Sequence, residues 1–500
     1  MNRSKKAVLN LSNQFLLHAV TAICGFIVPK LVLENFGSEI NGLTASIAQF
    51  LGVISLMESG FGAVAKSAFY KALASNDNKR ISGVYNATES FFHKVAFSFL
   101  AYCIVLSLCF PFIKETGYGY FYIISLVLVI GVNSFVQYYF GMSYTILLNA
   151  DQNGYISAFL QVISVLLNAL LTVFLIQVDA SIHIVKLVSS IVFIIRPIAI
   201  NLYCERKYKI DRSAPQDNAS VSQKWDNLGQ SIAHYAHTKT SYLFITFFLD
   251  FTKVSIYSVY SLITTSLSSI ITSISTGFVS GLGNIYANNE EENFKRVFSL
   301  YEFVNHFACF SFYTIAIITM VPFVKVYTAN VTDNAQYIMP AFGLFLIIGE
   351  LIYCIRLPYY YMITNAGHFK QISQSAYIEA GINIIISFVL VFPFGLTGLA
   401  IGTSIAMAYR TLYLVRYCSK NITHLQIKIP IRKILLFLFT SVSAILVAKV
   451  IQFTPNSIVY WLGYATIVGI AVVALFGCVS MVFYRRDIKT LFQKLKNVVR

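Results

Sequence analysis

The chain has 500 residues, of which 57% are hydrophobic, 15% aromatic and only 12% charged, and its formal net charge is +16. A soluble domain carries roughly 25% charged residues, so this composition excludes an ordinary soluble protein. The positive charge does not indicate nucleic-acid binding, because the basic residues lie in short loops between apolar runs. In membrane proteins such loops mark the cytoplasmic side.

Apolar runs long enough to cross a bilayer follow one another along the whole chain, and hydropathy predicts about fourteen spans. The opening M-N-R-S-K-K leads straight into the first span, so no removable signal peptide is expected. The last sixteen residues are basic and amphipathic, which suits a membrane surface. The expected spans lie near residues 8–34, 42–65, 92–113, 120–147, 155–178, 182–203, 229–250, 254–286, 303–327, 339–363, 372–393, 396–417, 431–452 and 457–483.

The basic loops all fall on one side of this count, and the opposite loops are short and hold few basic residues. The positive-inside rule and the even number of spans then place both termini in the cytoplasm. The basic positions are Lys5, Lys6, Lys66 to Arg80, Arg206 to Lys224, Lys295, Arg296, Lys370, Lys420 to Lys433, and Arg485 onward.

An internal repeat organises the chain. An offset of 216 residues relates Gln14 to Gln230 and His18 to His234, and it also relates Asn149-Ala150 to Asn365-Ala366. Each unit holds six spans, so the two units have the same orientation, an arrangement used by transporters. The expected domains are an N-terminal six-helix lobe (1–203), a basic cytoplasmic linker (204–224), a C-terminal six-helix lobe (225–417), helices 13 and 14 (418–484) and a basic tail (485–500).

The seventh span, 229–250, is unusually polar in its first half. Polar groups in lipid are costly unless they face protein or a water-filled cavity, so we expect a polar path. Lys239 is nine residues from Gln230 and falls on the opposite face of the helix. Contact with substrate and pairing within its own lobe are equally open for this lysine. The candidates for the path are Gln14, His18, Gln230, His234, His237, Lys239 and Ser241, although a structural hydrogen bond between helices fits either histidine equally well.

Other charges inside or beside the spans form a second set of candidates. Lys30 and Glu34 are four residues apart and are expected to pair. Arg196, Arg356 and above all Arg410 are expected to extend toward the membrane interface. The secondary cations are Lys30, Lys66, Arg196 and Arg356; the acids Glu58, Glu350 and Glu379 are either their partners or sites for a coupling cation.

Catalytic and metal-binding patterns are not found in the sequence. The eight cysteines form no C-x-x-C motif or Cys/His cluster, so no metal site or disulfide framework is expected. Paired loop carboxylates and phosphate-binding glycine loops are also absent from the sequence. We therefore expect a transporter rather than an enzyme, with no metal and no cofactor.

Three stretches carry a resemblance to a known family. They are L-V-L-E-N-F-G-S-E-I-N-G-L (31–43), G-F-G-A-V-A-K-S (60–67) and I-L-L-N-A-D-Q-N-G (146–154). With the helix pattern and the length, they resemble the polysaccharide transporters (Wzx-type O-antigen flippases) of the MATE-like superfamily. The resemblance implies an all-α polytopic fold with two parallel six-helix lobes plus an extra C-terminal helix pair.

The resemblance also implies a function and a place in the cell. It implies movement of an undecaprenyl-pyrophosphate-linked oligosaccharide from the cytoplasmic to the periplasmic leaflet of the bacterial inner membrane by alternating access. Helices 1, 2, 7 and 8 would line a cleft, and the extra pair would hold the lipid tail by analogy with lipid II flippases. Membrane lipids and enzymes of polysaccharide polymerisation and assembly are the partners it suggests, with no nucleic acid.

Two alternatives stay open at this point. A cation-coupled exporter of small organic cations or drugs belongs to the same superfamily, but it would favour an acidic, aromatic cavity over the basic and histidine-containing one expected here. A membrane-bound glycan polymerase or ligase would be expected to carry a sizeable periplasmic loop, and the predicted periplasmic loops are short.

Overall fold

The computed structural model describes residues 3–75, 77–114, 116–220, 239–288, 290–450, 453 and 455–485. Across these residues every regular element is a helix, and eleven helices are long and apolar enough to cross a membrane. The protein is thus an all-α, multi-pass membrane protein, as expected. The total of fourteen spans stays a prediction, because the first half of the seventh lies outside the described residues.

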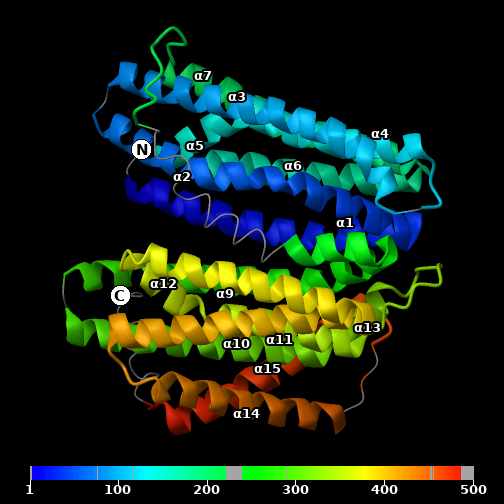
Figure 1. Cartoon of the computed structure of the whole chain (residues 1–500), viewed down its shortest axis with the longest axis vertical. Helices are drawn as coiled ribbons and strands as arrows, with labels where there is room; N and C mark the ends of the chain where they lie inside the picture. The colour runs from blue at the N-terminus through cyan, green and yellow to red at the C-terminus, as the bar shows by residue number, and fades with distance from the viewer. Residues whose placement is uncertain are drawn as a thin grey trace. The chain divides into compact units, whose positions relative to one another are not determined.

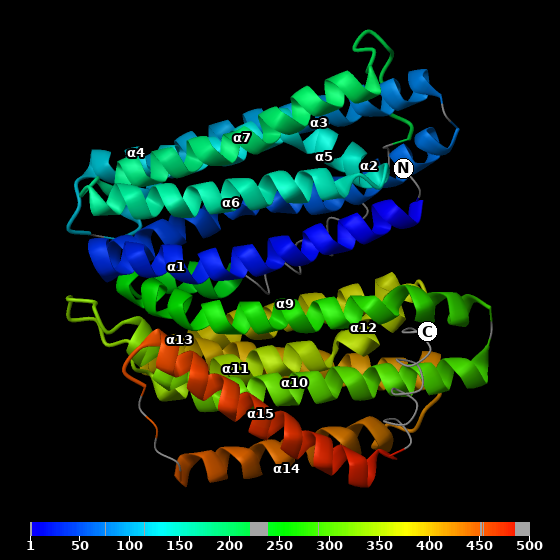
Figure 2. The same cartoon turned by 180° about the vertical axis from the view of Figure 1, so that it is seen from behind.

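Two of the eleven helices are long enough for two passes each, at 47 and 53 residues, since one pass needs roughly 20. Helix α1 (Arg3–Leu51) turns at Gly37, and α13 (Phe369–Cys418) turns at Gly395. Both glycines have positive φ, 80° and 54°, which other residues rarely adopt. Figures 1 and 2 show that the chain runs back alongside itself after each of these turns.

The described residues divide into two compact units: unit 1 comprises residues 1–255 and 331–333, and unit 2 comprises 256–330 and 334–500. Unit 1 includes helices α1, α2 (Ser55–Ala74), α3 (Asn78–Cys109), α4 (Tyr120–Val136), α5 (Met142–Ala150), α6 (Gly154–Gln177) and α7 (Ile182–Tyr208). The helices of unit 2 are α9 (Phe251–Ala287, whose first five residues belong to unit 1), α10 (Glu291–Tyr327), α11 (Pro340–Ile355), α12 (Leu357–Asn365), α13, α14 (Lys428–Val450) and α15 (Ile458–Phe483).

Helix boundaries differ from the hydropathy prediction where polar residues continue a helix beyond its apolar part. The third span was expected near 92–113, but α3 begins at Asn78, where the Asp77 side chain accepts hydrogen bonds from the backbone N–H groups of Lys79 and Arg80. This N-cap satisfies donors that otherwise lack a partner. The expected span 120–147 is α4 and α5 joined by a π-helical turn at 137–141, and the expected span 339–363 is α11 followed by α12.

Each unit has its own aromatic core. In unit 1, Phe61, Phe92 and Tyr144 belong to a cluster that joins α2, α3 and α5. In unit 2, Phe298 and Tyr359 belong to the equivalent cluster between α10 and α12. Burying such large apolar side chains is the main favourable contribution to each core.

The first part of the linker between the expected lobes is fixed on α3. The Asn86 amide donates to the carbonyl oxygens of Asp211 and Ala214, and the Asp217 N–H donates to the carbonyl of Gly83. The approach is so close that a Cβ at Gly83 would lie 2.9 Å from the Pro215 carbonyl oxygen. The linker up to Ser220 is therefore part of unit 1 rather than a loose connection.

The two C-terminal helices dock on α10 in unit 2, and Figure 2 shows α15 crossing beside it. From α14, the ring of Phe437 packs against Phe303 and Phe310. From α15, the indole N–H of Trp461 donates to the Thr319 carbonyl. The extra pair is thus attached to unit 2 through α10.

Candidate functional site: polar clusters and an apolar groove

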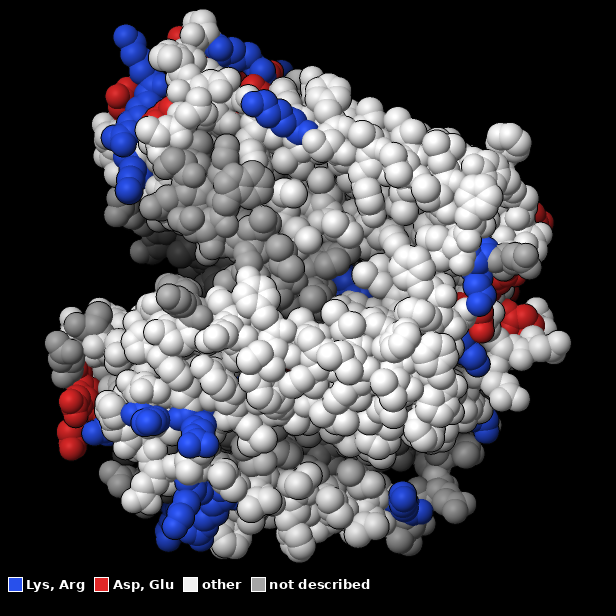
Figure 3. All heavy atoms as spheres, viewed as in Figure 1, with Lys and Arg blue, Asp and Glu red and all other residues white. Residues whose placement is uncertain are grey.

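The predicted substrate path is covered only in part by the described residues. Gln14 and His18 are exposed on α1, on the same face of the helix. Gln230, His234 and His237 lie outside the described residues, so their place in a path stays a prediction. Figure 3 shows most charged side chains on this face of the molecule near the helix ends, with a broad uncharged surface between them, as expected for a membrane protein.

Lys239 and Ser241 lie at the start of the described part of the seventh span, where residues 239–248 are helical. Ser241 is buried and Lys239 is half-buried. Within the described residues, no salt bridge involves Lys239. A half-buried ammonium without an acidic partner is unfavourable in an apolar surrounding, which keeps a role in anion contact open for this lysine.

Further along, residues 246–255 pack on the part of α1 after its turn, inside unit 1. The Asn41 amide donates to the Ser255 hydroxyl over 2.7 Å, and the Ser46 and Thr246 hydroxyls form a hydrogen bond with each other. A Cβ at Gly42 would overlap the carbonyl oxygen of Phe251. Glycine at position 42 is therefore required by the close approach of two backbones.

The secondary cations of unit 1 mostly have partners nearby. The Lys30 ammonium lies 3.5 Å from the Glu34 carboxylate, which confirms the expected pair. Arg196 donates to the Ser157 hydroxyl over 2.9 Å. Lys66 lies over the Tyr70 ring, 5.8 Å from its centroid. All three cations thus have contacts within unit 1. A role of these cations in transport stays a prediction.

In unit 2 a buried carboxylate holds two arginines. Glu379 accepts from Arg356 over 2.6 Å and from Arg410 over 2.7 Å, and all three side chains are at most 8% exposed. The expectation that Arg356 and Arg410 extend to the interface is wrong, because a buried guanidinium finds a better partner in the carboxylate than in distant water. Sequence could not show that α11, α12 and α13 bring these residues together.

The remaining two acids have hydroxyl neighbours instead. Tyr138 donates to the Glu58 carboxylate over 3.0 Å. Glu350 lies beside the Ser268 side chain of α9, and Arg356 is within electrostatic range. Among the three predicted acids, Glu379 is thus the clear partner of the cations.

A further buried ion pair was missed by the sequence analysis. Lys433 lies 2.6 Å from Glu302, and both side chains are at most 4% exposed. In the predicted topology Lys433 belongs to the basic stretch Lys420 to Lys433, and Glu302 lies next to the expected start of the ninth span. A lysine within the first two turns of an apolar helix is the signal that could have identified the pair.

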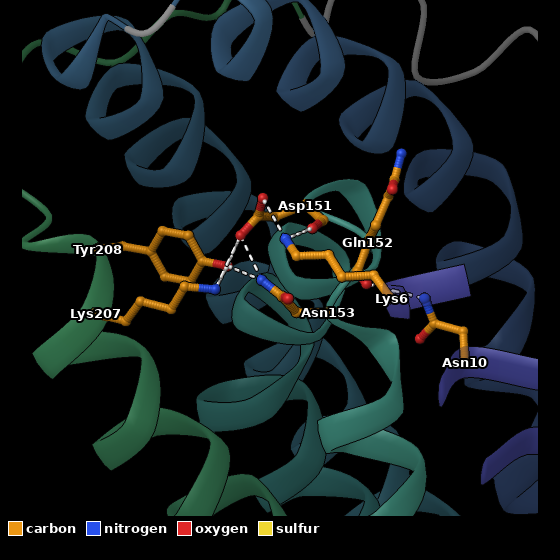
Figure 4. Close-up of polar contacts among 7 residues, drawn as sticks. All are labelled: Lys6, Asn10, Asp151, Gln152, Asn153, Lys207 and Tyr208. Atoms are coloured by element: carbon orange, nitrogen blue, oxygen red, sulfur yellow. Dashed lines mark hydrogen bonds and ion pairs between the residues drawn. The ribbon is translucent and has the colours of Figure 1, made fainter. Parts of the chain in front are cut away.

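At one end of unit 1, Asp151 joins three helices, as Figure 4 shows. Its carboxylate accepts from Tyr208 over 2.6 Å and from Lys207 over 2.9 Å, and the Lys6 ammonium lies 3.6 Å away. Burial tends to raise the pKa of Asp151, but the hydrogen bonds from Tyr208 and Lys207 and the charges of Lys207 and Lys6 outweigh it and lower the pKa. The beginning of α1 is thereby tied to the α5–α6 turn and to the end of α7.

An apolar groove of about 670 Å³ lies along α14 and α15 in unit 2. Its walls come almost entirely from aliphatic and aromatic side chains, and the residues of α14 and α15 face each other across it. The lining residues are Ile318, Ser443, Ala444, Val447, Ala448, Phe453, Val459, Tyr460, Gly463, Tyr464, Ile467, Val468, Ala471, Val472 and Leu475. Such a groove suits a long hydrocarbon chain rather than a charged ligand.

Among solved structures, the chain is similar to the lipid II flippase MurJ in an inward closed conformation, with a TM-score of 0.71, 17% identity and coverage of 96% of this chain and 100% of that one. The fold is that of the MurJ and MATE transporters. An inward-facing multidrug MATE transporter of the MOP superfamily gives a TM-score of 0.63 at 13% identity, covering 85% of this chain and 99% of that one. The MATE multidrug transporter DinF-BH gives 0.61 at 13% identity, covering 85% and 98%.

Comparison by sequence adds no assignment: no protein-family model matches the chain, and no curated protein matches it. The similar structures therefore establish the fold and leave the substrate open. The solved structures differ in the share of this chain that they cover. MurJ accounts for 96% of this chain, whereas the two MATE transporters account for 85%.

Proposed function

We propose that the protein is a flippase that moves undecaprenyl-pyrophosphate-linked oligosaccharide repeat units, of O-antigen, capsule or exopolysaccharide, across the bacterial inner membrane by alternating access. The carrying observation is the apolar groove between α14 and α15. A polyprenyl tail is a long hydrocarbon, and each buried CH₂ group contributes roughly 0.8 kcal/mol. The groove supports a substrate with a lipid tail.

The head of such a substrate is an anionic pyrophosphate with a hydroxyl-rich glycan. It needs hydrogen-bonding groups and positive charge along its path, and it needs no nucleophile. Lys239 is a described cation suited to contact with an anion, because it is half-buried and no salt bridge among the described residues involves it. Gln14 and His18 offer hydroxyl-binding groups on an exposed face of α1. The cytoplasmic position of both termini and contacts with polymerising and assembly proteins belong to the same proposal.

A MATE-like exporter of small organic molecules is the second candidate, because multidrug MATE transporters share the fold. Two observations favour the flippase over it. The MATE structures account for a smaller share of this chain than MurJ does. The groove also lies on the two C-terminal helices, and its uncharged lining offers no counter-charge to a small organic cation.

Deletion of the gene for this protein separates the two candidates. A flippase predicts that the undecaprenyl-linked repeat unit accumulates facing the cytoplasm and that surface polysaccharide is lost. Mass analysis of the accumulated lipid identifies the glycan. Normal polysaccharide display together with new drug sensitivity would favour the exporter.

The groove itself is tested by a bulky substitution with a matched control. Ala471→Trp fills the groove, whereas Val473→Trp places the same indole on an exposed part of α15 outside it. We expect A471W to lower polysaccharide export at least about tenfold, equivalent to ~1.4 kcal/mol, at unchanged protein level, while V473W exports as wild type. Equal export by both variants would refute a role of the groove.

The anion contact is tested by Lys239→Ala with Lys79→Ala, an exposed lysine at the start of α3, as its control. We expect K239A to impair export without changing the protein level and K79A to have no effect. Export by K239A at the wild-type rate would show that Lys239 is structural.

A further inference from the structure

The ion pair between Glu302 and Lys433 is the centre of a buried cluster in unit 2. One carboxylate oxygen of Glu302 accepts from Lys433 over 2.6 Å, and the other accepts from the Tyr359 hydroxyl over 2.5 Å. Lys433 also donates to the carbonyl and hydroxyl oxygens of Ser299, at 3.4 Å and 3.2 Å. The carboxylate is thus fully paired, and the cluster joins α10, α12 and α14.

His306 lies one helical turn beyond Glu302, on the same face of α10. Its side chain is completely buried, and neither ring nitrogen has a hydrogen-bond partner of normal geometry among the described residues. The backbone of Ile355 faces the ring, and the Tyr359 ring lies 6.2 Å away between centroids. A buried imidazole with no hydrogen bond of normal geometry is rare and calls for an explanation.

Water can come close to this cluster. A cavity of about 80 Å³ borders Glu302 and Tyr359 and extends to the beginning of α10 and α14. One water needs roughly 10–15 Å³ of such space together with polar partners. The polar groups around the cavity supply these partners: Lys295, Ser299, Glu302, Tyr359, Ser419 and Thr423.

The charged and titratable groups that face Glu302 come from four helices. They are Lys295 and His306 from α10, Tyr359 from α12, Cys418 from the end of α13 and Lys433 from α14. The formal charge that directly opposes the carboxylate is that of Lys433. If α14 moved away from α10, Glu302 would be left as a buried carboxylate without its counter-ion, which is strongly unfavourable.

We propose that His306 is a proton-binding site whose occupancy excludes the docking of Lys433 on Glu302. With α14 docked, Lys433 neutralises Glu302 and the imidazole is neutral. When α14 undocks, a proton from cavity water binds the free ring nitrogen of His306, and the imidazolium replaces the ammonium as counter-ion. The ring then donates to the carboxylate, to the Ile355 carbonyl or to both.

Proton uptake and undocking of α14 are thereby linked, because each favours the same state. The other contacts that hold α14 on α10 carry no formal charge: the aromatic contacts of Phe437 and the hydrogen bond from Thr314 to Ser441 over 2.8 Å. Since α14 forms one wall of the apolar groove, protonation of His306 would be coupled to the position of that wall. The proposal concerns the protein alone and does not depend on which lipid is carried.

Nuclear magnetic resonance of the full chain labelled with ¹⁵N-histidine tests the site directly, with His306→Gln to assign the signal. In wild type we expect the His306 ring to stay neutral between about pH 8 and pH 6. In Lys433→Gln the ring should be at least half protonated at about pH 6.5. The control Lys428→Gln removes an exposed lysine of the same helix and should match wild type. Identical His306 titration in wild type and K433Q would overturn the proposal.

A second measurement covers the case in which K433Q does not fold. Hydrogen–deuterium exchange of α14, corrected for the intrinsic effect of pH, should increase at least about threefold in wild type between pH 8 and pH 5. In H306Q, which keeps the Glu302–Lys433 pair, this increase should vanish, whereas the exposed control His424→Asn should retain it. The same pH dependence in wild type and H306Q would show that the cluster is structural only. Neither measurement uses substrate, so loss of the flippase proposal would leave both results valid.

Discussion

Replacing Glu379 by glutamine should be among the most damaging conservative substitutions in the chain. The carboxylate is the shared partner of Arg356 and Arg410, and all three side chains are buried. The glutamine keeps the shape but removes the negative charge, so two guanidinium groups are left facing each other. Removing one partner of a buried ion pair costs about 3–5 kcal/mol. With roughly 2–4 °C per kcal/mol for a unit of this size, the melting temperature should fall by roughly 6–20 °C.

Two controls separate charge from packing. Arg410→Gln leaves a complete Arg356–Glu379 pair, so we expect a smaller loss, on the order of 1.5–3 kcal/mol for a hydrogen bond to a charged group. Glu34→Gln breaks the pair with Lys30, whose two side chains are 16% and 20% exposed at 3.5 Å, and should cost below about 1 kcal/mol.

The assay is thermal unfolding of purified protein in detergent, followed by intrinsic fluorescence. The expected order of melting temperatures is wild type, E34Q, R410Q and then E379Q. A fall of less than about 2 °C for E379Q, or equal falls for E379Q and R410Q, would refute the argument from an uncompensated pair of cations.

Other predictions concern the backbone and the Asp151 cluster. The pKa of Asp151 is lowered in the folded chain, so the stabilisation by its carboxylate is present above the unfolded pKa of about 3.9 and is lost as the pH falls through the folded pKa. We expect hydrogen-exchange protection at the start of α1 to fall with this loss, and Asp151→Asn should remove that acid dependence. Gly42→Ala should abolish accumulation of folded protein, because its Cβ would overlap the Phe251 backbone. Gly395→Ala has open space and should lower stability by only about 1–3 kcal/mol through backbone strain, measured by thermal unfolding.

The sequence predicted the fold class well because hydropathy over some twenty residues depends little on tertiary contacts. It also predicted the Lys30–Glu34 pair, which is local to one helix. It failed where partners are distant: Arg410 meets Glu379 across 31 positions and Lys433 meets Glu302 across 131. A charge inside an apolar run indicates that a partner is needed without saying which helix supplies it.

The helix boundaries and the polar path could also be predicted only in part from the sequence. Hydropathy alone did not detect the early start of α3, because Asn78, Lys79 and Arg80 are polar yet helical. The predicted path face rests on Gln230, His234 and His237, which lie outside the described residues, so it remains a prediction. The resemblance implied that the extra helix pair holds a lipid tail, but hydropathy does not show which faces of α14 and α15 line the apolar groove.

The glycine turns at positions 37 and 395 have a consequence for biogenesis. Each joins two stretches of membrane helix with a single residue of non-helical backbone. An inserting chain normally releases one helix into lipid and carries a hydrophilic loop across before the next. Because the turn is so short, we expect each pair to enter the bilayer as one hairpin, with the turn leading across. An epitope or glycosylation site inserted at Gly37 or Gly395 would therefore stall insertion rather than simply mark topology.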